Sequence, residues 1–212
     1  MPDRRDVRAR YDTLSRYYDV IAGWTEQPAR DRGLARLAPA AGERIVEVGV
    51  GTGRTAAALA RAVGPLGMVV AVDVSAGMLR RTVARGGPSL HAARACCGDA
   101  VALPLRAGAF DAACMIFTLE LLPDGEMAQA AHELARVLRP GGRACVVSLS
   151  SAGAETMARR WYVRGHQAFP GALDCRPIAV KPVLESAGFS SISVDSMRLW
   201  GLPVDVVTGC RT

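Results

Sequence analysis

The chain has 212 residues, half of them hydrophobic, and carries a formal net charge of +6 at pH 7. This length and composition are typical of a soluble, globular chain that forms one domain over residues 1–212. No apolar run approaches the roughly 20 residues of a membrane-spanning helix. The first five residues lead into no signal-peptide core, so a cytoplasmic protein is expected.

The positive charge is almost entirely arginine, because Lys181 is the only lysine. Arginines cluster near the start of the chain and around residues 159–164, close to Trp24, Trp161 and Tyr162. Such clusters usually form solvated helix faces, and a peripheral contact with a membrane surface is the alternative.

Six cysteines are scattered along the chain, and no two have the spacing of a zinc knuckle or a redox pair. Free thiols are therefore expected. Cys96, Cys114, Cys145 and Cys210 fall in expected strands, where cysteine behaves as a small buried hydrophobe.

The chain begins with two expected helices. Residues 7–22 have the spacing of a helix with one apolar and aromatic face, which includes Tyr18. A second helix is expected over residues 29–37, before a strand over residues 44–48. Residues 1–40 are therefore interpreted as a helical lead-in to a sheet.

Residues 45–53, with the sequence IVEVGVGTG, point most directly to a ligand. A strand ends there in Gly49, Gly51 and Gly53, and an alanine-rich helical pattern follows over residues 55–63. Glycines permit positive φ in such a turn and leave the backbone bare for a ligand. The pattern predicts a loop for a nucleotide-type cofactor.

A carboxylate closes the next expected strand, residues 68–72. Asp73 follows Gly53 by twenty residues, the spacing at which a βαβ unit presents a carboxylate to a ribose diol. The alternative is a helix N-cap, because Asp73 and Ser75 both precede an expected helix over residues 77–85.

Strands and helices continue to alternate along the chain. Strands are expected over residues 94–97, 109–117 and 144–148, and a helix over residues 125–138. Asp99 follows the first of these strands, as Asp73 follows the one before it. The sequence Arg139-Pro140-Gly141-Gly142 stops the helix.

The last third of the chain differs. Residues 150–182 are interpreted as a cap-like insertion, and a helix is expected over residues 177–187. Strands over residues 188–199 and 204–210 then form a terminal hairpin. The whole pattern predicts an α/β fold with a Rossmann-like doubly wound sheet of about seven strands, mostly parallel, with helices on both faces.

Ligands of such sheets bind at the carboxyl ends of the strands, where Glu47, Asp73 and Asp99 are expected. A nicotinamide dinucleotide would favour a third glycine at Arg54, one residue after Gly53. Three carboxylates would also repel its pyrophosphate, whereas they would attract a sulfonium and an ammonium. Charge therefore favours a cationic nucleoside cofactor.

These motifs together resemble the class I S-adenosylmethionine-dependent methyltransferases. The segments that carry the resemblance are residues 47–53, 72–73, 98–100, 110–111 and 136–142. The lead-in from Tyr11 to Asp19 and the terminal hairpin are similar to the ubiquinone and menaquinone biosynthesis group, and some relatives with that pattern are phospholipid N-methyltransferases.

The resemblance implies S-adenosylmethionine as cofactor, S-adenosylhomocysteine as its product, and no metal. It implies cofactor-binding roles for Tyr18, Glu47, Gly49, Gly51, Gly53, Asp73, Met78, Asp99, Ala100, Phe117 and Thr118. Asp73 would bind the ribose, Asp99 and Ala100 the adenine, and the glycine loop with Glu47 the methionine portion.

Methyl transfer needs an aligned nucleophile and, where that nucleophile carries a proton, a base. The candidate bases are Glu120, at the exit of the fourth strand, and His166, in the cap-like insertion. Arg176 could grip an anionic group of the acceptor, whereas His91 and His132 look structural.

The sequence predicts methyl transfer to a small hydrophobic acceptor, a quinone precursor or a lipid. A phospholipid N-methyltransferase and a catalytically silent cofactor-binding protein are the alternatives. No nucleic-acid partner is expected, because the sequence lacks an RNA-binding module and the tetrapeptide typical of base-amino methylation.

Overall fold

The computed structural model describes residues 26–86, 93–152 and 175–212. Tyr18, His91 and His166 lie outside these ranges, as do Trp24 and Trp161. The first part of the expected lead-in and the middle of the expected cap are therefore not described.

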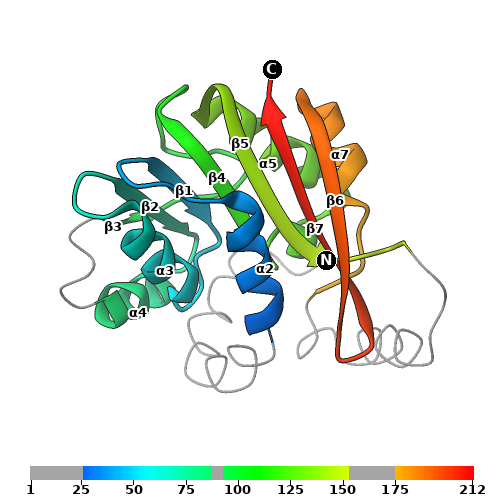
Figure 1. Ribbon diagram of the computed structural model, residues 1–212, viewed down its shortest axis with the longest axis horizontal. Helices are drawn as coiled ribbons and strands as arrows, with labels where there is room; N and C mark the ends of the chain where they lie inside the picture. Colours follow the sequence, from blue (N-terminus) through cyan, green and yellow to red (C-terminus); the bar gives the residue numbers. More distant parts are fainter. Residues whose placement is uncertain (1–25, 87–92, 153–174) are drawn as a thin grey trace.

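Seven strands form one mixed sheet in the order β3-β2-β1-β4-β5-β7-β6 (Figure 1). They are β1 (Arg44–Val48), β2 (Met68–Asp73), β3 (Ala93–Cys97), β4 (Phe110–Ile116), β5 (Leu138–Leu149), β6 (Phe189–Leu199) and β7 (Leu202–Arg211). β1 to β5 are parallel, whereas β7 runs antiparallel to both β5 and β6. This order confirms the expected fold.

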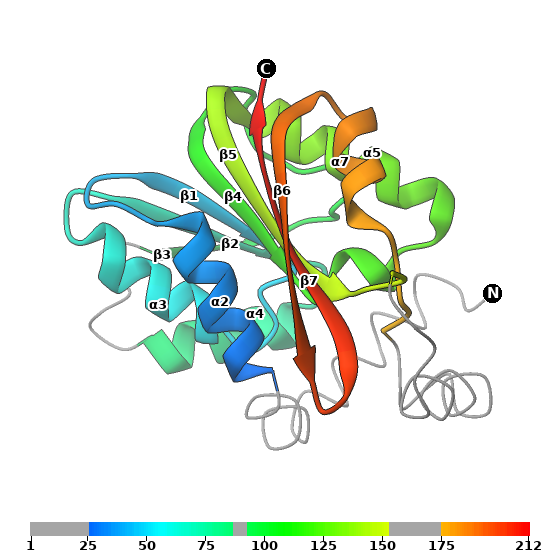
Figure 2. The ribbon, with the colours of Figure 1, turned by 45° about the vertical axis from the view of Figure 1, so that its right-hand side comes forward.

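Helices cover both faces of the sheet, as Figures 1 and 2 show. They are α2 (Gln27–Leu37), α3 (Arg54–Val63), α4 (Ala76–Gly86), α5 (Asp124–Val137), α7 (Val180–Ser186) and the short 3-10 helix η2 (Leu119–Leu121). Among the helices of the described ranges, none is long and apolar enough to cross a bilayer.

Two core clusters lie on opposite faces of the sheet. Ile45 of β1 packs with Leu59 of α3, on the face that also carries α2 and α4. Val46, the next residue, belongs to the cluster on the other face, which includes Leu134 of α5. β1 and β2 consist almost entirely of buried residues, because α3 and α4 cover one face and the cluster that includes Val101 and Leu103 covers the other.

β5 begins earlier than the strand expected over residues 144–148. Leu138 already pairs with Phe110, and the ladder resumes at Ala112 and Arg143. Residues 139–142 bulge between these pairs, and Gly141 has a φ of 72°. The Pro-Gly-Gly sequence ends α5 as predicted, but it forms a bulge inside a strand rather than a separate turn.

All six cysteines are free thiols, as expected. Cys114 and Cys145 are buried at the centre of the sheet. The prediction of burial is wrong for Cys96 and Cys210, which are half-buried. Cys96 lies on β3, an edge strand, and Cys210 lies at the end of β7, where fewer neighbours cover the sheet.

Candidate functional site

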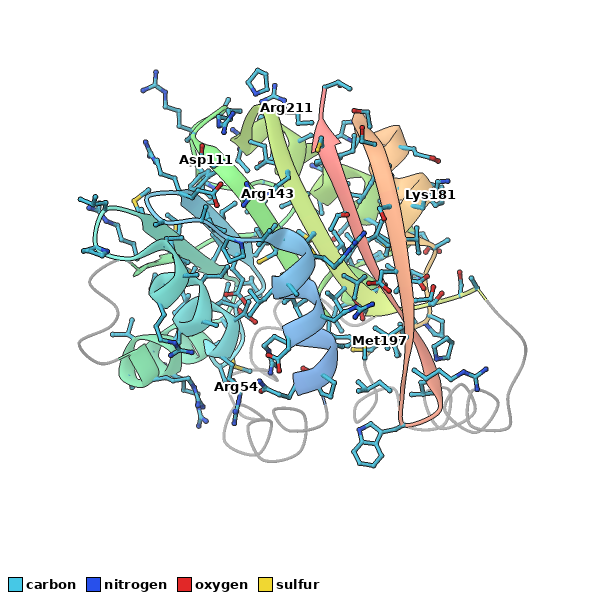
Figure 3. All side chains as sticks on the ribbon, in the orientation of Figure 1. Arg54, Asp111, Arg143, Lys181, Met197 and Arg211 are labelled. Carbon is cyan, nitrogen blue, oxygen red and sulfur yellow. The ribbon has the colours of Figure 1, made fainter. Side chains whose placement is uncertain are left out.

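The carboxyl ends of the parallel strands meet at one edge of the sheet, the lower edge in Figure 1, which we call the carboxyl edge. The segments that follow the strands gather there: the glycine loop after β1, Asp73 on β2, Asp99 after β3 and Thr118 after β4. In Figure 3, Arg54 at the start of α3 marks this edge, and Arg143 lies nearer the opposite edge.

The glycine loop is tied to β2 by backbone hydrogen bonds. The amides of Gly49 and Val50 both donate to the carbonyl of Val72, at 2.8 and 3.1 Å, and Gly53 donates to Val50 at 3.1 Å. Gly49, Gly51 and Gly53 have φ values of 77°, 53° and 81°. The predicted need for positive φ at all three glycines is therefore confirmed.

The three glycines have different neighbours. A Cβ on Gly49 would collide with the side chain of Thr118, and one on Gly53 would lie 2.8 Å from the Cα of Thr82 on α4. No atom of the described residues lies within 4 Å of a Cβ placed on Gly51. Gly49 and Gly53 thus permit close packing, whereas Gly51 leaves bare backbone facing open space.

Asp73 binds the loop directly through its carboxylate. The Gly51 amide donates to Oδ2 and the Ser75 amide donates to Oδ1, each at 2.9 Å. The cap of α4 is Ser75, whose Oγ accepts the Met78 amide at 3.2 Å. Asp73 is therefore not the N-cap of α4, and its carboxylate is held beside the glycine loop instead.

The segment after β3 joins the same unit. The Gly98 amide donates to the Asp73 carbonyl at 3.1 Å, and Asp99 Oδ1 accepts the Val101 amide at 3.1 Å. Asp99 and Ala100 are half-buried. Hydrogen bonds thus bring the glycine loop, Asp73 and Asp99 together, while the Met78 side chain lies almost fully buried on α4.

Phe117 and Thr118 lie where β4 ends. Phe117 has a φ of 51°, a left-handed conformation that a bulky side chain rarely adopts, and its side chain is buried in the cluster beneath α2 and α3. Thr118 is half-buried, and its Oγ1 donates to the Gly49 carbonyl at 3.4 Å. Strained residues of this kind are concentrated at functional sites.

Glu47 is a buried carboxyl group, only 2% exposed. Burial raises its pKa to about 8, although the Arg30 guanidinium and a hydrogen bond with the Thr55 side chain act in the opposite direction. Its Oε2 atom has no hydrogen-bond partner among the described residues. A cationic group brought to this oxygen would favour the charged carboxylate.

Sequence reasoning missed Glu26 and Arg30, which lie at the start of α2. Arg30 is 7% exposed, and its Nη2 lies 3.4 Å from Glu26 Oε2. Burial raises the pKa of Glu26 to about 7, an effect that Arg30 opposes. A Glu–Arg pair four residues apart is visible in the sequence, but only the packing of α2 on the sheet brings Arg30 near Glu47.

Glu120 lies on η2 and is 1% exposed. The Leu149 amide, at the end of β5, donates to its Oε1 at 3.3 Å, and Oε2 has no partner within the described ranges. Burial raises the pKa of Glu120 to about 8, and the nearby charge of Glu26 adds to this shift, whereas Arg176 opposes it. The structure thus places this candidate base in a buried position at the carboxyl edge.

The expected role of Arg176 is not supported. Its guanidinium already binds Asp124, at 2.6 Å from Oδ1, and the Leu122 carbonyl at 2.7 Å. His132 lies on the exposed side of α5, with Nδ1 2.7 Å from the Ala128 carbonyl, in agreement with a structural role.

Comparison with known proteins decides the family. The family model described as "Methyltransferase domain" matches residues 45–142. The demethylmenaquinone methyltransferase of Clavibacter sepedonicus is 32% identical over 201 residues, which cover 92% of this chain and 76% of that relative. The chain belongs to the class I S-adenosylmethionine-dependent methyltransferases.

Two further comparisons set the limits of this similarity. The demethylmenaquinone methyltransferase of Corynebacterium kroppenstedtii is 34% identical over 151 residues, and the match spans 61% of the length of that relative. The solved structure of the [4+2]-cyclase SpnF covers 99% of this methyltransferase chain and 97% of its own, with a TM-score of 0.76 and 20% identity. That likeness concerns the fold alone.

The carboxyl edge of this methyltransferase fits the cofactor of its family. S-adenosylmethionine carries a ribose diol, a sulfonium and an ammonium, and the edge offers Asp73, the unpartnered oxygen of Glu47 and the open side of Gly51. Within the described ranges, no three His, Cys, Asp or Glu side chains are grouped as metal ligands.

Proposed function

We propose that this chain transfers a methyl group from S-adenosylmethionine to a small hydrophobic acceptor of the quinone-precursor type. The carboxylate of Asp73 carries the cofactor half of the proposal, because backbone amides hold both of its oxygens beside Gly51. The relatives named demethylmenaquinone methyltransferase support the acceptor half.

The cofactor-binding roles follow the order of the strands. Asp73 binds the ribose hydroxyls, Asp99 and Ala100 the adenine, and Glu47 the ammonium. The other side chains and glycines proposed to surround the cofactor are Gly49, Gly51, Gly53, Met78, Phe117 and Thr118, together with Tyr18 from the part of the chain that is not described.

When bound, the cofactor supplies an electrophilic methyl group on its sulfonium. The protein has to align the acceptor, exclude water and accept a proton where one is released. Glu120 is proposed as that base: because burial raises its pKa to about 8, its carboxylate form binds a proton more strongly than an exposed carboxylate does, and that form becomes more populated as pH rises toward 8. His166 remains the second candidate.

The acceptor is proposed to lie beside the end of β5, under the cap-like residues 150–182. The Ile178 amide donates to the Leu149 carbonyl at 2.9 Å, and the Ser151 amide donates to the Ile178 carbonyl at 3.0 Å. The segment between Ser151 and Ile178 therefore leaves and rejoins the sheet at one point, close to Glu120. This closeness supports the proposed pocket.

Calorimetry with S-adenosylhomocysteine and the full chain tests the cofactor half. Asp73→Ala should weaken binding by about 100-fold, because a charge-assisted contact with a buried ribose is lost. Asp31→Ala is the matched control, since Asp31 is an exposed carboxylate of α2 that accepts hydrogen bonds from the side chain of Gln27. Equal affinity of the Asp73 variant and the control would contradict the ribose role.

Transfer of a labelled methyl group tests the acceptor half. A demethylquinol with a short tail should be methylated, and phosphatidylethanolamine should not. Methylation of phosphatidylethanolamine alone would favour the phospholipid alternative. Cofactor binding without transfer to any acceptor of the panel would favour a silent binding protein.

A further inference from the structure

The turn between β6 and β7 carries an exposed tryptophan. Leu199 pairs with Leu202, so only Trp200 and Gly201 connect the two strands. Trp200 is 77% exposed, and among the described residues only Leu66 is a more exposed large hydrophobic side chain. The indole therefore adds little to the core.

The backbone of this turn does not favour tryptophan either. Trp200 and Gly201 have φ values of 54° and 82°, the left-handed pair of a type I′ hairpin turn. Asn-Gly is the preferred sequence for that geometry, whereas a bulky side chain is disfavoured at its first position. Neither the turn nor the core accounts for Trp200.

The turn lies at the carboxyl edge, on the same side of the sheet as the glycine loop. Val204 pairs with Leu149, the last residue of β5, so the hairpin extends past the end of that strand, as Figures 1 and 2 show. Asp205 fixes the base of the hairpin by accepting hydrogen bonds from Ser150 and Ser196. The turn is thus attached firmly beside the proposed acceptor pocket.

The residues around the turn have the chemistry of a membrane interface. Residues 196–203, SMRLWGLP, contain no acidic residue, and their one charge is on Arg198. Arg198 is exposed and forms no ion pair with any residue that the structure describes. Tryptophan with flanking arginine and leucine is typical of segments that lie at the headgroup level of a bilayer.

We propose that the β6–β7 turn, with Trp200 at its tip and Arg198 beside it, is a contact for an anionic lipid bilayer. The contact directs the carboxyl edge toward the membrane in which a hydrophobic acceptor dissolves. The benefit of this contact to the enzyme rests on the proposed function, whereas the exposed turn that would make the contact is observed independently of it. A lipid surface fits better than a second copy, because a stable protein interface buries about 800 Å² on each partner, far more than one turn presents.

Vesicle sedimentation with the full chain tests the contact. Vesicles of phosphatidylcholine with about one third phosphatidylglycerol provide the anionic surface. Trp200→Asn suits the turn geometry and should leave the fold intact, but it should weaken vesicle binding about tenfold, because the aromatic anchor is lost. The unchanged chain should also bind more weakly to vesicles of phosphatidylcholine alone than to the anionic vesicles.

Leu66→Asn is the matched control, because Leu66 is 90% exposed but lies in the loop before β2, at the opposite edge. It should bind vesicles as the unchanged chain does. The inference would be overturned if the unchanged chain did not bind the vesicles. It would also be overturned if Trp200→Asn bound them as strongly as the unchanged chain does. A change of oligomeric state in Trp200→Asn, measured by analytical ultracentrifugation, would assign the surface to a second copy and overturn it too.

The two proposals can fail separately. Trp200→Asn should bind S-adenosylhomocysteine and methylate a water-soluble acceptor as the unchanged chain does. Loss of vesicle binding with transfer intact supports the contact, whereas vesicle binding by a chain that transfers no methyl group would leave the contact standing and remove the proposed function.

Discussion

Two buried glutamates at the carboxyl edge differ from a glutamate at the amino edge in how their oxygens are paired. At the amino edge, Glu43 is held by Arg143, with two oxygen–nitrogen distances of 2.7 Å, and this hydrogen bonding lowers the pKa of Glu43. At the carboxyl edge, burial raises the pKa values of Glu47 and Glu120 to about 8, and each leaves an oxygen without a partner among the described residues.

This contrast distinguishes carboxylates that stabilise the fold from buried carboxyl groups that are available to a ligand. Asp111, near the amino edge in Figure 3, also has its hydrogen bonds satisfied, by the Arg139 side chain and the Arg44 amide. Satisfied ion pairs of this kind contribute to the folded state and offer nothing to a ligand. Unsatisfied buried carboxyls cost stability until a ligand meets them, which is typical of functional sites.

The largest effect is expected from Gly49→Ala. The new Cβ would collide with Thr118 and would also be strained by the φ of 77°, so unfolding by urea should show a loss of about 3 kcal/mol or more. Gly51→Ala lacks that collision and should lose only about 1 kcal/mol from backbone strain. Equal losses would show that packing against Thr118 does not distinguish the two glycines.

Glu120→Gln should change how stability depends on pH. The raised pKa of Glu120 means that the folded state keeps its proton, while the unfolded carboxyl loses it above pH about 4.5. The unchanged chain should therefore lose stability as pH rises from about 5 to 8, by an amount on the order of 3 kcal/mol. The glutamine variant should lose less, and parallel curves from urea unfolding would contradict the burial argument.

Glu47→Gln should change the protons released on cofactor binding. Near pH 7 the buried carboxyl is largely protonated, and an ammonium placed beside it favours the charged form. Binding of S-adenosylhomocysteine near pH 7 should release close to one proton, and the affinity should rise about 30-fold from pH 6 to pH 8. Calorimetry in buffers of different ionisation enthalpy measures this, and the glutamine variant should release markedly fewer protons.

The smallest effect is expected from Glu43→Gln at the amino edge. Because the pKa of Glu43 is lowered, its contribution is present above the unfolded value and is lost as pH falls through the folded one. Thermal unfolding at pH 7 should show a loss of about 1 kcal/mol, which becomes smaller as pH falls below about 4.5. Affinity for S-adenosylhomocysteine should stay unchanged. A weaker affinity would contradict the argument that carboxylates at the amino edge serve stability and not cofactor binding.

Sequence reasoning succeeded where the information is local. The glycine spacing and the acid at the end of each strand are encoded within one βα unit, so Gly49, Gly51, Gly53, Asp73 and Asp99 could be placed without a structure. The Pro-Gly-Gly sequence at residues 140–142 predicts where α5 ends but does not predict the bulge inside β5, since Pro and Gly occur at strand bulges as well as in loops.

It failed where distant segments meet. Arg30 approaches Glu47 because α2 packs across the sheet, and part of that packing comes from Arg32, whose Nε lies 2.7 Å from Asp195 Oδ2, 163 residues away along the chain. No local pattern encodes such a contact. The roles of the cofactor-binding residues and of the candidate bases stay predictions, and Tyr18 and His166 lie outside the described residues.

The sequence by itself determined the family's cofactor loop, the alternation of strands and helices and the acids at the strand ends, because each of these is written in short-range periodicity and spacing. Only the tertiary structure decided which glycine faces open space, which carboxyls are buried without a partner, and that Trp200 projects beside the end of β5. The physical reason is that burial and charge depend on neighbours brought together by the whole fold, and residue type alone does not specify them.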